Sequence, residues 1–217
     1  MIKLKLTGNL IKALSTIPES NYYLESNYYL YLDLSDCRTI SSVLRSTKIF
    51  SKIKNRIVSL TFPNTIKAIR CDKNHEFIFE NFHNLKSITG KNVKDIGKHA
   101  FEGCESLETV EFPNAISIND YAFANCELIE SINFPKVESI GRGAFVNCSL
   151  QSVNLPNVTK IDDYAFVNCL DLESVYIPKI NEINDTVFWG CKPFLNNTLL
   201  INRIDNFISD VDKEYHL

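Results

Sequence analysis

The chain repeats itself at a nearly fixed interval. The first residue of the hydrophobic pair in each inferred strand recurs 28, 28, 28, 22, 22, 21 and 22 residues after the previous one. These positions are Leu4, Leu32, Leu60, Ile88, Val110, Ile132, Val153 and Val175. A fixed period of this length is typical of a solenoid, in which each coil packs only on its neighbours. We therefore expect an elongated array with extended faces and few closed pockets.

The repeat is clearest in the second half of the chain. Each copy has Ala-Phe, a Cys three residues after the Phe, a Leu or Ile, and an alternating hydrophobic pair before a Pro. The phenylalanine column comprises Phe101, Phe123, Phe145, Phe166 and Phe188. The cysteine column comprises Cys104, Cys126, Cys148, Cys169 and Cys191. Both columns keep step with the strands, which predicts that they share one core.

Alternation ahead of each proline predicts a short strand with one buried face. Val110 and Phe112 face one way, and Thr109 and Glu111 face the other. Pro113 ends this strand, because proline has no N–H to donate to a neighbour. Strands one repeat apart should pair in a parallel sheet, and the outer side of these short coils should be only a turn.

The first coils are longer, and we predict a helix on the outer, convex side of each. The best helical spacing lies in 40–53, at Ile40, Val43, Leu44, Phe50 and Ile53. The fold class is therefore an α/β solenoid with one parallel concave sheet. A single domain should span 1–217, with three strand-helix coils over 1–84, shorter coils over 85–191 and a C-terminal cap over 192–217. Within the cap, 199–212 should form a strand remnant and a helix that cover the open apolar edge.

Composition indicates a folded, soluble chain. Its 217 residues are 45% hydrophobic and 23% charged, enough for a substantial core. No apolar run approaches the roughly 18 residues that a membrane span needs. The N-terminal sequence lacks the apolar core of a signal peptide, so the expectation from these residues is a cytoplasmic protein.

The cysteines are interpreted as buried residues that pack in the core. Five of the seven occur once per coil, which favours a buried ladder of free thiols over disulfides. No C-x-x-C pair with histidine companions is present, so we predict neither a metal site nor a cofactor.

Charge is divided between the two halves. Residues 1–95 carry a net charge of +7 and residues 96–217 a net charge of −10. No acidic residue interrupts 38–56, which contains Arg38, Arg45, Lys48, Lys52, Lys54 and Arg56. Such a basic helix could contact nucleic acid or an anionic membrane, but a solvated outer helix is the favoured interpretation, because aromatic side chains are not interleaved with it.

No catalytic motif is found. Phosphate-binding, dinucleotide-binding and nucleophile-elbow patterns are absent from the sequence. His75 and Glu76 begin like a zinc-protease motif, but Phe79 occupies the position of its second histidine. The recurring pair Asp162 and Asp163 is interpreted as a turn. The sequence therefore predicts that the chain is not an enzyme.

One copy of the repeat carries a family pattern. Its residues are Ile161, Ala165, Phe166, Cys169, Leu172, Val175, Ile177 and Pro178. This I-x-x-x-A-F-x-x-C-x-x-L-x-x-V-x-I-P phrase resembles the BspA-like leucine-rich repeats, strongly over 77–191, and the longer coils before it resemble ordinary leucine-rich repeats. The resemblance implies a right-handed solenoid that mediates protein contacts, often in surface or secreted proteins.

The solvent-facing strand positions are the candidate contacts for a partner. The residues just after the hydrophobic anchors are varied and polar, and glutamates flank them where the strands begin. The predicted partner-binding residues are Tyr31, Asp33, Thr89, Glu108, Glu111, Glu130, Asn133, Asn154, Glu173 and Tyr176. Tyrosine is enriched among interface anchors, and the glutamates favour a basic partner toward the C-terminal half.

Three functions remain open from the sequence. The favoured one is a non-catalytic module that binds a protein or peptide ligand on its concave sheet, most simply as a monomer. The second is a nucleic-acid or membrane adaptor that acts through the basic segment 38–56. The third is a structural protein that self-assembles head to tail, because its two halves carry opposite charge.

Overall fold

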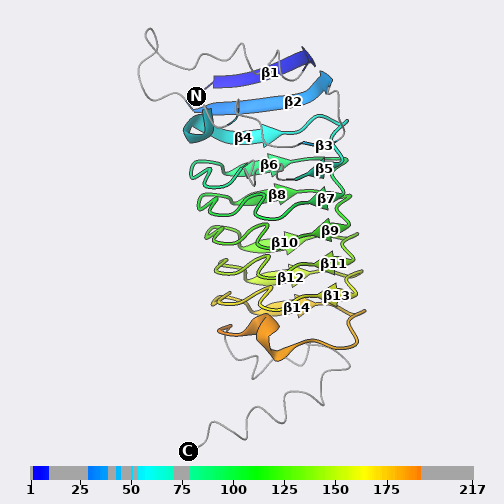
Figure 1. Ribbon diagram of the computed structural model, residues 1–217. Helices are drawn as coiled ribbons and strands as arrows, with labels where there is room; N and C mark the ends of the chain where they lie inside the picture. Colours follow the sequence, from blue (N-terminus) through cyan, green and yellow to red (C-terminus); the bar gives the residue numbers. More distant parts are fainter. Residues whose placement is uncertain are drawn as a thin grey trace, which may run out of the picture.

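Parallel strands stack into an elongated column of coils (Figure 1). The computed structural model describes residues 2–9, 29–38, 43–44, 50, 53–70 and 79–191. The helical cap expected within 199–212 lies outside these residues. None of the described helices is long and apolar enough to cross a membrane.

The first sheet contains the strands that the repeat predicts. Five of them pair in the order β1 (Ile2–Asn9), β2 (Leu30–Arg38), β4 (Ile57–Thr61), β6 (Ser87–Thr89) and β8 (Thr109–Glu111). Three more pair in the order β10 (Ser131–Asn133), β12 (Ser152–Asn154) and β14 (Ser174–Tyr176). Leu4 lies opposite Leu32, and Val153 lies opposite both Ile132 and Val175. The predicted phase of the strands is confirmed.

The first sheet is interrupted between β8 and β10. Gly90 donates its backbone N–H to the Glu111 carbonyl at 2.9 Å, and Phe134 donates to the Asn154 carbonyl at 3.3 Å. Among the described residues, Phe112, which has the same place in its own coil, makes no such bond to the coil of β10. The expected continuous sheet is therefore two sheets in line, and the coil lengths do not explain the interruption.

A second parallel sheet runs along the other side of the core, where helices were expected in the first coils and turns in the short ones. Its two-residue strands are β3 (Val43–Leu44), β5 (Ala68–Ile69), β7 (Asp95–Ile96), β9 (Ser117–Ile118), β11 (Ser139–Ile140) and β13 (Lys160–Ile161). Ile96, Ile118 and Ile140 pair in register and are buried. Each short coil from that of β6 to that of β12 is thus closed by two strands, and the expectation of a bare turn is wrong there.

The helix predicted over 40–53 is wrong at Val43 and Leu44. These two residues form β3 and pair with Ala68 and Ile69 of β5. Pairing with β5 gives the backbone partners that a helix would have supplied internally, and β-branched valine favours extended backbone. Phe50 does have helical backbone, and a 3₁₀ turn, η1 (Lys54–Arg56), begins after Ile53. The rest of 40–53 lies outside the described residues.

Stacked phenylalanine rings form the axis of the core. Phe101, Phe123, Phe145, Phe166 and Phe188 stack in sequence with ring centroids 5.3 Å apart. Phe79 extends the column by one more coil, at 5.4 Å from Phe101. Every ring from Phe79 to Phe166 is fully buried, whereas Phe188 is half-buried. This arrangement confirms the predicted core and lengthens it.

The cysteine column runs beside the rings. Each thiol donates a hydrogen bond to the carbonyl of the phenylalanine one coil back, for example Cys126 to Phe101 at 3.2 Å and Cys148 to Phe123 at 3.1 Å. Burial raises the pKa of Cys148 to about 12. The column is buried as predicted as far as Cys169, but Cys191 is half-buried. The prediction of complete burial is therefore wrong at its last member.

A column of left-handed backbone follows the phenylalanines, and sequence reasoning missed it. Two residues after each ring, φ is positive at Asn81, Gly103, Asn125, Asn147, Asn168 and Gly190. Asparagine and glycine are the residues that adopt this conformation at least cost. Asn147 also donates its side-chain amide to Asn125 at 2.8 Å and accepts one from Asn168 at 3.0 Å. The same column thus sets the turn and links the coils.

Candidate functional site

The exposed face of the first sheet carries the predicted contact residues near its C-terminal end. Asn133, Asn154 and Tyr176 lie side by side in register on β10, β12 and β14. All three are exposed, and Tyr176 exposes 55% of its surface. The Asn154 side-chain amide donates to the side-chain oxygen of Asn133 at 3.2 Å. An aromatic ring and two amides therefore form one continuous row.

Two further predicted residues lie across the interruption from this row. Glu111 of β8 is exposed and lies opposite Thr89 of β6, which is half-buried. The Thr89 hydroxyl donates to the Glu111 carboxylate at 3.4 Å, a long contact that leaves most of the acceptor capacity of Glu111 unused. We call Glu111, Asn133, Asn154 and Tyr176 the polar row.

The glutamates that precede the strands are not equivalent. Lys86 donates a hydrogen bond to Glu108 in an ion pair of 2.9 Å, and this hydrogen bond raises the pKa of Lys86. Glu130 is exposed, and within the described part of the chain no ion pair involves it. Glu173 is exposed on the third coil of this group. Lys86 therefore offsets the charge of Glu108, whereas Glu130 adds negative charge beside β10.

Tyr31 and Asp33 lie on β2, several coils away from the polar row. Both are half-buried. The Ser35 backbone N–H donates to Asp33 at 2.9 Å, and this bond, together with the Ser35 hydroxyl, lowers the pKa of Asp33. Tyr31 lies opposite Ser59 in the sheet. The structure thus keeps these two residues apart from the other predicted contacts.

The positions just before the anchors form a hydroxyl column with structural contacts. Ser87 donates its hydroxyl to the Ser59 hydroxyl on the neighbouring strand at 2.8 Å. Such a bond joins adjacent coils and uses groups that a ligand would otherwise bind. The hydroxyl column is therefore less suited to recognition than the polar row.

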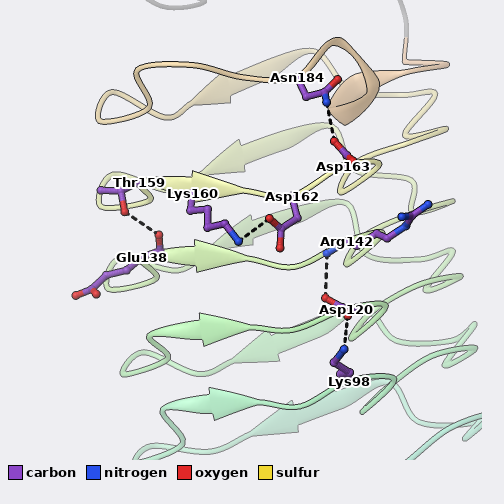
Figure 2. Close-up of polar contacts among 9 residues, drawn as sticks. All are labelled: Lys98, Asp120, Glu138, Arg142, Thr159, Lys160, Asp162, Asp163 and Asn184. Atoms are coloured by element: carbon purple, nitrogen blue, oxygen red, sulfur yellow. Dashed lines mark hydrogen bonds and ion pairs between the residues drawn. The ribbon is translucent and has the colours of Figure 1, made fainter.

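The second sheet bears a set of charged contacts that sequence reasoning missed (Figure 2). Lys98 pairs with Asp120 at 2.5 Å, and the Arg142 backbone N–H donates to the other Asp120 oxygen at 3.2 Å. Lys160 pairs with Asp162 at 2.7 Å on β13 and the turn that follows it. Partial burial raises the pKa of Asp120, but Lys98 and the Arg142 amide more than offset it, so the net shift is downward.

These contacts could have been found by comparing equivalent residues from coil to coil. Lys98, Asp120, Arg142 and Asp163 occupy one position in four successive coils, and their charges alternate in sign. Asp163 accepts the Asn184 side-chain amide at 2.8 Å, in a turn as predicted. Alternation over one repeat length does not show in a short sequence window, which is why the pattern was missed.

The described residues include no group of three or more His, Cys, Asp or Glu arranged to hold a metal ion. The histidines that are described make local contacts. His99 stacks on Tyr121 with ring centroids 5.1 Å apart and contacts Glu102. His83 lies 3.4 Å from Glu105. These neighbours suit surface packing and support no nucleophile or proton relay.

Comparison with solved structures gives the same architecture. A leucine-rich repeat protein from Bacteroides ovatus is 26% identical, with a TM-score of 0.51, and the match covers 69% of this chain and 37% of that protein. The leucine-rich repeat protein of T. pallidum is 27% identical, with a TM-score of 0.52, and the match covers 61% of this chain and 62% of that one. The chain thus spans less than two thirds of the length of either protein. Curated protein sequences gave no significant match.

A family description matches the repeat itself. The model of the BspA type leucine rich repeat region matches in six copies, over residues 45–169 and 116–208. These ranges include the phenylalanine and cysteine columns, both sheets of the short coils and part of the longer N-terminal coils. The match therefore begins earlier than 77–191, where the sequence pattern is strongest. The chain belongs to the BspA type leucine-rich repeat family.

Proposed function

We propose that this chain is a non-catalytic module that binds a protein or peptide across the exposed face of its first sheet. Leucine-rich repeat proteins in general are protein-interaction scaffolds rather than enzymes, which supports the general assignment. The observation that carries the specific site is the polar row, in which neighbouring strands present Asn133, Asn154 and Tyr176 to solvent in register.

The dimensions of the row suit an extended peptide. Neighbouring strands lie about 4.8 Å apart, so the step from β10 to β14 is about 10 Å. An extended chain advances about 3.3 Å per residue, and three residues cover that distance. A peptide that crosses the strands therefore meets Tyr176 at one end and Asn133 at the other, and it can extend toward Glu111.

The chemistry of the row favours a basic ligand with an apolar side chain. Tyr176 offers a ring that loses little conformational freedom on binding, and Asn133 and Asn154 offer both donors and acceptors. Glu111, Glu130 and Glu173 place negative charge around these groups. Charge of one sign around a contact surface selects partners of the opposite sign and speeds their association.

Selection of displayed random peptides on the purified chain tests this function. We expect the selected sequences to be rich in Lys and Arg and to contain an apolar residue. A double variant with Glu111→Lys and Tyr176→Ala should lose most of their binding, while its melting temperature stays nearly unchanged, because substitutions of exposed residues usually change stability by about 0.5 kcal/mol or less.

A matched charge reversal provides the control. Glu138 is an exposed glutamate that precedes β11 on the second sheet. Glu138→Lys changes the net charge as Glu111→Lys does, but it should leave peptide binding intact. Undiminished binding by the double variant, combined with loss on neutralising Lys48, Lys52 and Lys54, would instead place the site on the basic segment 38–56.

A further inference from the structure

A hollow of about 660 Å³ lies on the outer face of the second sheet, over β5, β7 and β9. Gly97 directly follows β7, and it lies between Arg70, which directly follows β5, and Asn119, which directly follows β9. A Cβ on Gly97 would lie 2.4 Å from the Ile69 carbonyl oxygen, so close strand packing requires glycine there. The volume of the hollow is in the range of small-ligand sites.

Cations surround this hollow. Arg70, Lys94 and Lys98 line it, and Lys67 precedes β5 at the position that Lys94 occupies before β7. Strand spacing places the Lys67 and Lys94 backbones about 5 Å apart. Both lysines are exposed, and within the described part of the chain no ion pair involves either of them. Like charges on adjacent strands repel each other, and a bound anion would relieve that repulsion.

Two fixed carboxylates limit the positive charge. Asp95 lies within the hollow, where Arg70 pairs with it and where Ser117 and Asn119 donate to it at 2.9 and 2.8 Å. Asp120 pairs with Lys98 at 2.5 Å. The two acids offset Arg70 and Lys98, and Lys67 and Lys94 outnumber Glu138, which follows Ile116 in the same row one strand further along. This moderate excess suits separate carboxylates better than a densely charged phosphate polymer.

An apolar side chain completes the lining. Ile116 lies beside Lys94, one strand further along, and exposes 37% of its surface. An ammonium group beside aliphatic surface matches a carboxylate on an aliphatic stem, which is the glutamate side chain. None of the residues that line the hollow is aromatic, so the hollow has no ring on which a nucleic-acid base could stack.

We propose that this hollow binds a glutamate-rich segment of a partner protein, at a site distinct from the polar row of the first sheet. The two sites would favour ligands of opposite charge and lie on different sheets. A chain with both would join a basic partner to an acidic one.

Titration of the full chain with fluorescently labelled hexaglutamate, followed by anisotropy, tests the proposal. Lys94→Ala should weaken binding about tenfold, the usual effect of losing one contact to a charged group. Ile116→Lys should tighten binding, because it adds a third lysine to the row of Lys67 and Lys94. Lys136→Ala is the matched control, since Lys136 is exposed in a nearby turn and bonds Asn114 at 2.6 Å.

Three outcomes would overturn the site. Equal loss in the Lys94→Ala and Lys136→Ala variants would indicate diffuse attraction rather than a site. Unchanged affinity in both the Lys94→Ala and Ile116→Lys variants would exclude the hollow. Tighter binding of an oligothymidylate of equal charge would exclude a carboxylate ligand. The Glu111→Lys and Tyr176→Ala double variant should bind hexaglutamate at least as well as the natural chain, so failure of one site can be distinguished from failure of the other.

Discussion

At the scale of the residue, the sequence predicts which side chains are buried but not every backbone conformation. Phe123 and Cys126 recur at fixed offsets and lie in the core as expected. The left-handed column that includes Asn125 was missed, although only Asn or Gly occupies that position from Asn81 to Gly190. The physical reason is that alternation predicts which way a side chain faces but says nothing about φ. Positive φ is indicated only by residue types that tolerate it, such as Asn and Gly.

Thiol reactivity should differ along the cysteine column. With a pKa of about 12, Cys104 and Cys148 have about one thiolate in ten thousand molecules at pH 8, and burial blocks access as well. Cys191 is half-buried, and its hydrogen bond with Cys169 lowers its pKa. We expect Cys191 to be labelled before the other members of the cysteine column in the folded chain, as mass spectrometry of labelled peptides would show. Labelling of Cys148 as fast as in denaturant would contradict the buried ladder.

Asn147 allows the cost of left-handed backbone to be measured. Asn147→Ala should lower the free energy of unfolding by about 1–2 kcal/mol more than Asn147→Gly does, because only alanine is strained at positive φ. Both variants lose the amide bonds to Asn125 and Asn168, so the glycine variant controls for them. Urea denaturation measures the difference, and equal stability of the two variants would refute the conformational argument.

At the scale of the element, long alternating segments were predicted and two-residue strands were not. Five strands of the first sheet, β4, β8, β10, β12 and β14, carry an apolar pair and a following proline, which identifies them. The strand Ser117–Ile118 contributes only one inward side chain, too short for alternation to identify. The predicted helix failed at Val43–Leu44, because pairing with β5 outweighed a helical spacing of apolar residues. At the candidate site, the same alternation predicts which residues face outward. The Lys98–Asp120 contact could not be predicted in this way, because it joins two successive coils.

The phenylalanine column should hold the coils together unequally along its length. Phe145→Ala removes a fully buried ring from between Phe123 and Phe166, and it should cost about 3–5 kcal/mol. Phe188→Ala removes a half-buried ring and should cost less. Thermal and urea unfolding of the two variants measure both losses. Equal losses would mean that the last coil is packed as firmly as the middle of the array.

At the scale of the whole molecule, the two sheets differ in continuity. The second sheet runs unbroken from β3 to β13, and the stack of rings runs from Phe79 to Phe188. Within the residues that the structure describes, the first sheet alone is divided, between β8 and β10. The period of the repeat could not have revealed this division, because a sequence in perfect phase predicts equivalent coils.

Hydrogen exchange should locate the division. The backbone amides of Gly90 and Phe134 donate to the next coil, and we expect them to exchange slowly. The amide of Phe112 has no such acceptor in the coil of β10, so it should exchange faster than either. Exchange followed by NMR measures these rates in the native chain. Equal protection of the three amides would show that β8 and β10 pair in solution.

A column of coils that is paired without a break along one side and divided along the other should bend at the division. We expect the second sheet and the ring stack to hold these coils together at β9 and β11 while the first sheet opens or closes between β8 and β10. Glu111 lies on one side of the division, on β8, and Asn133, Asn154 and Tyr176 lie on the other side. If the polar row is the contact surface, we expect its reach to vary with this opening, so that ligands of somewhat different length fit it without any coil unfolding.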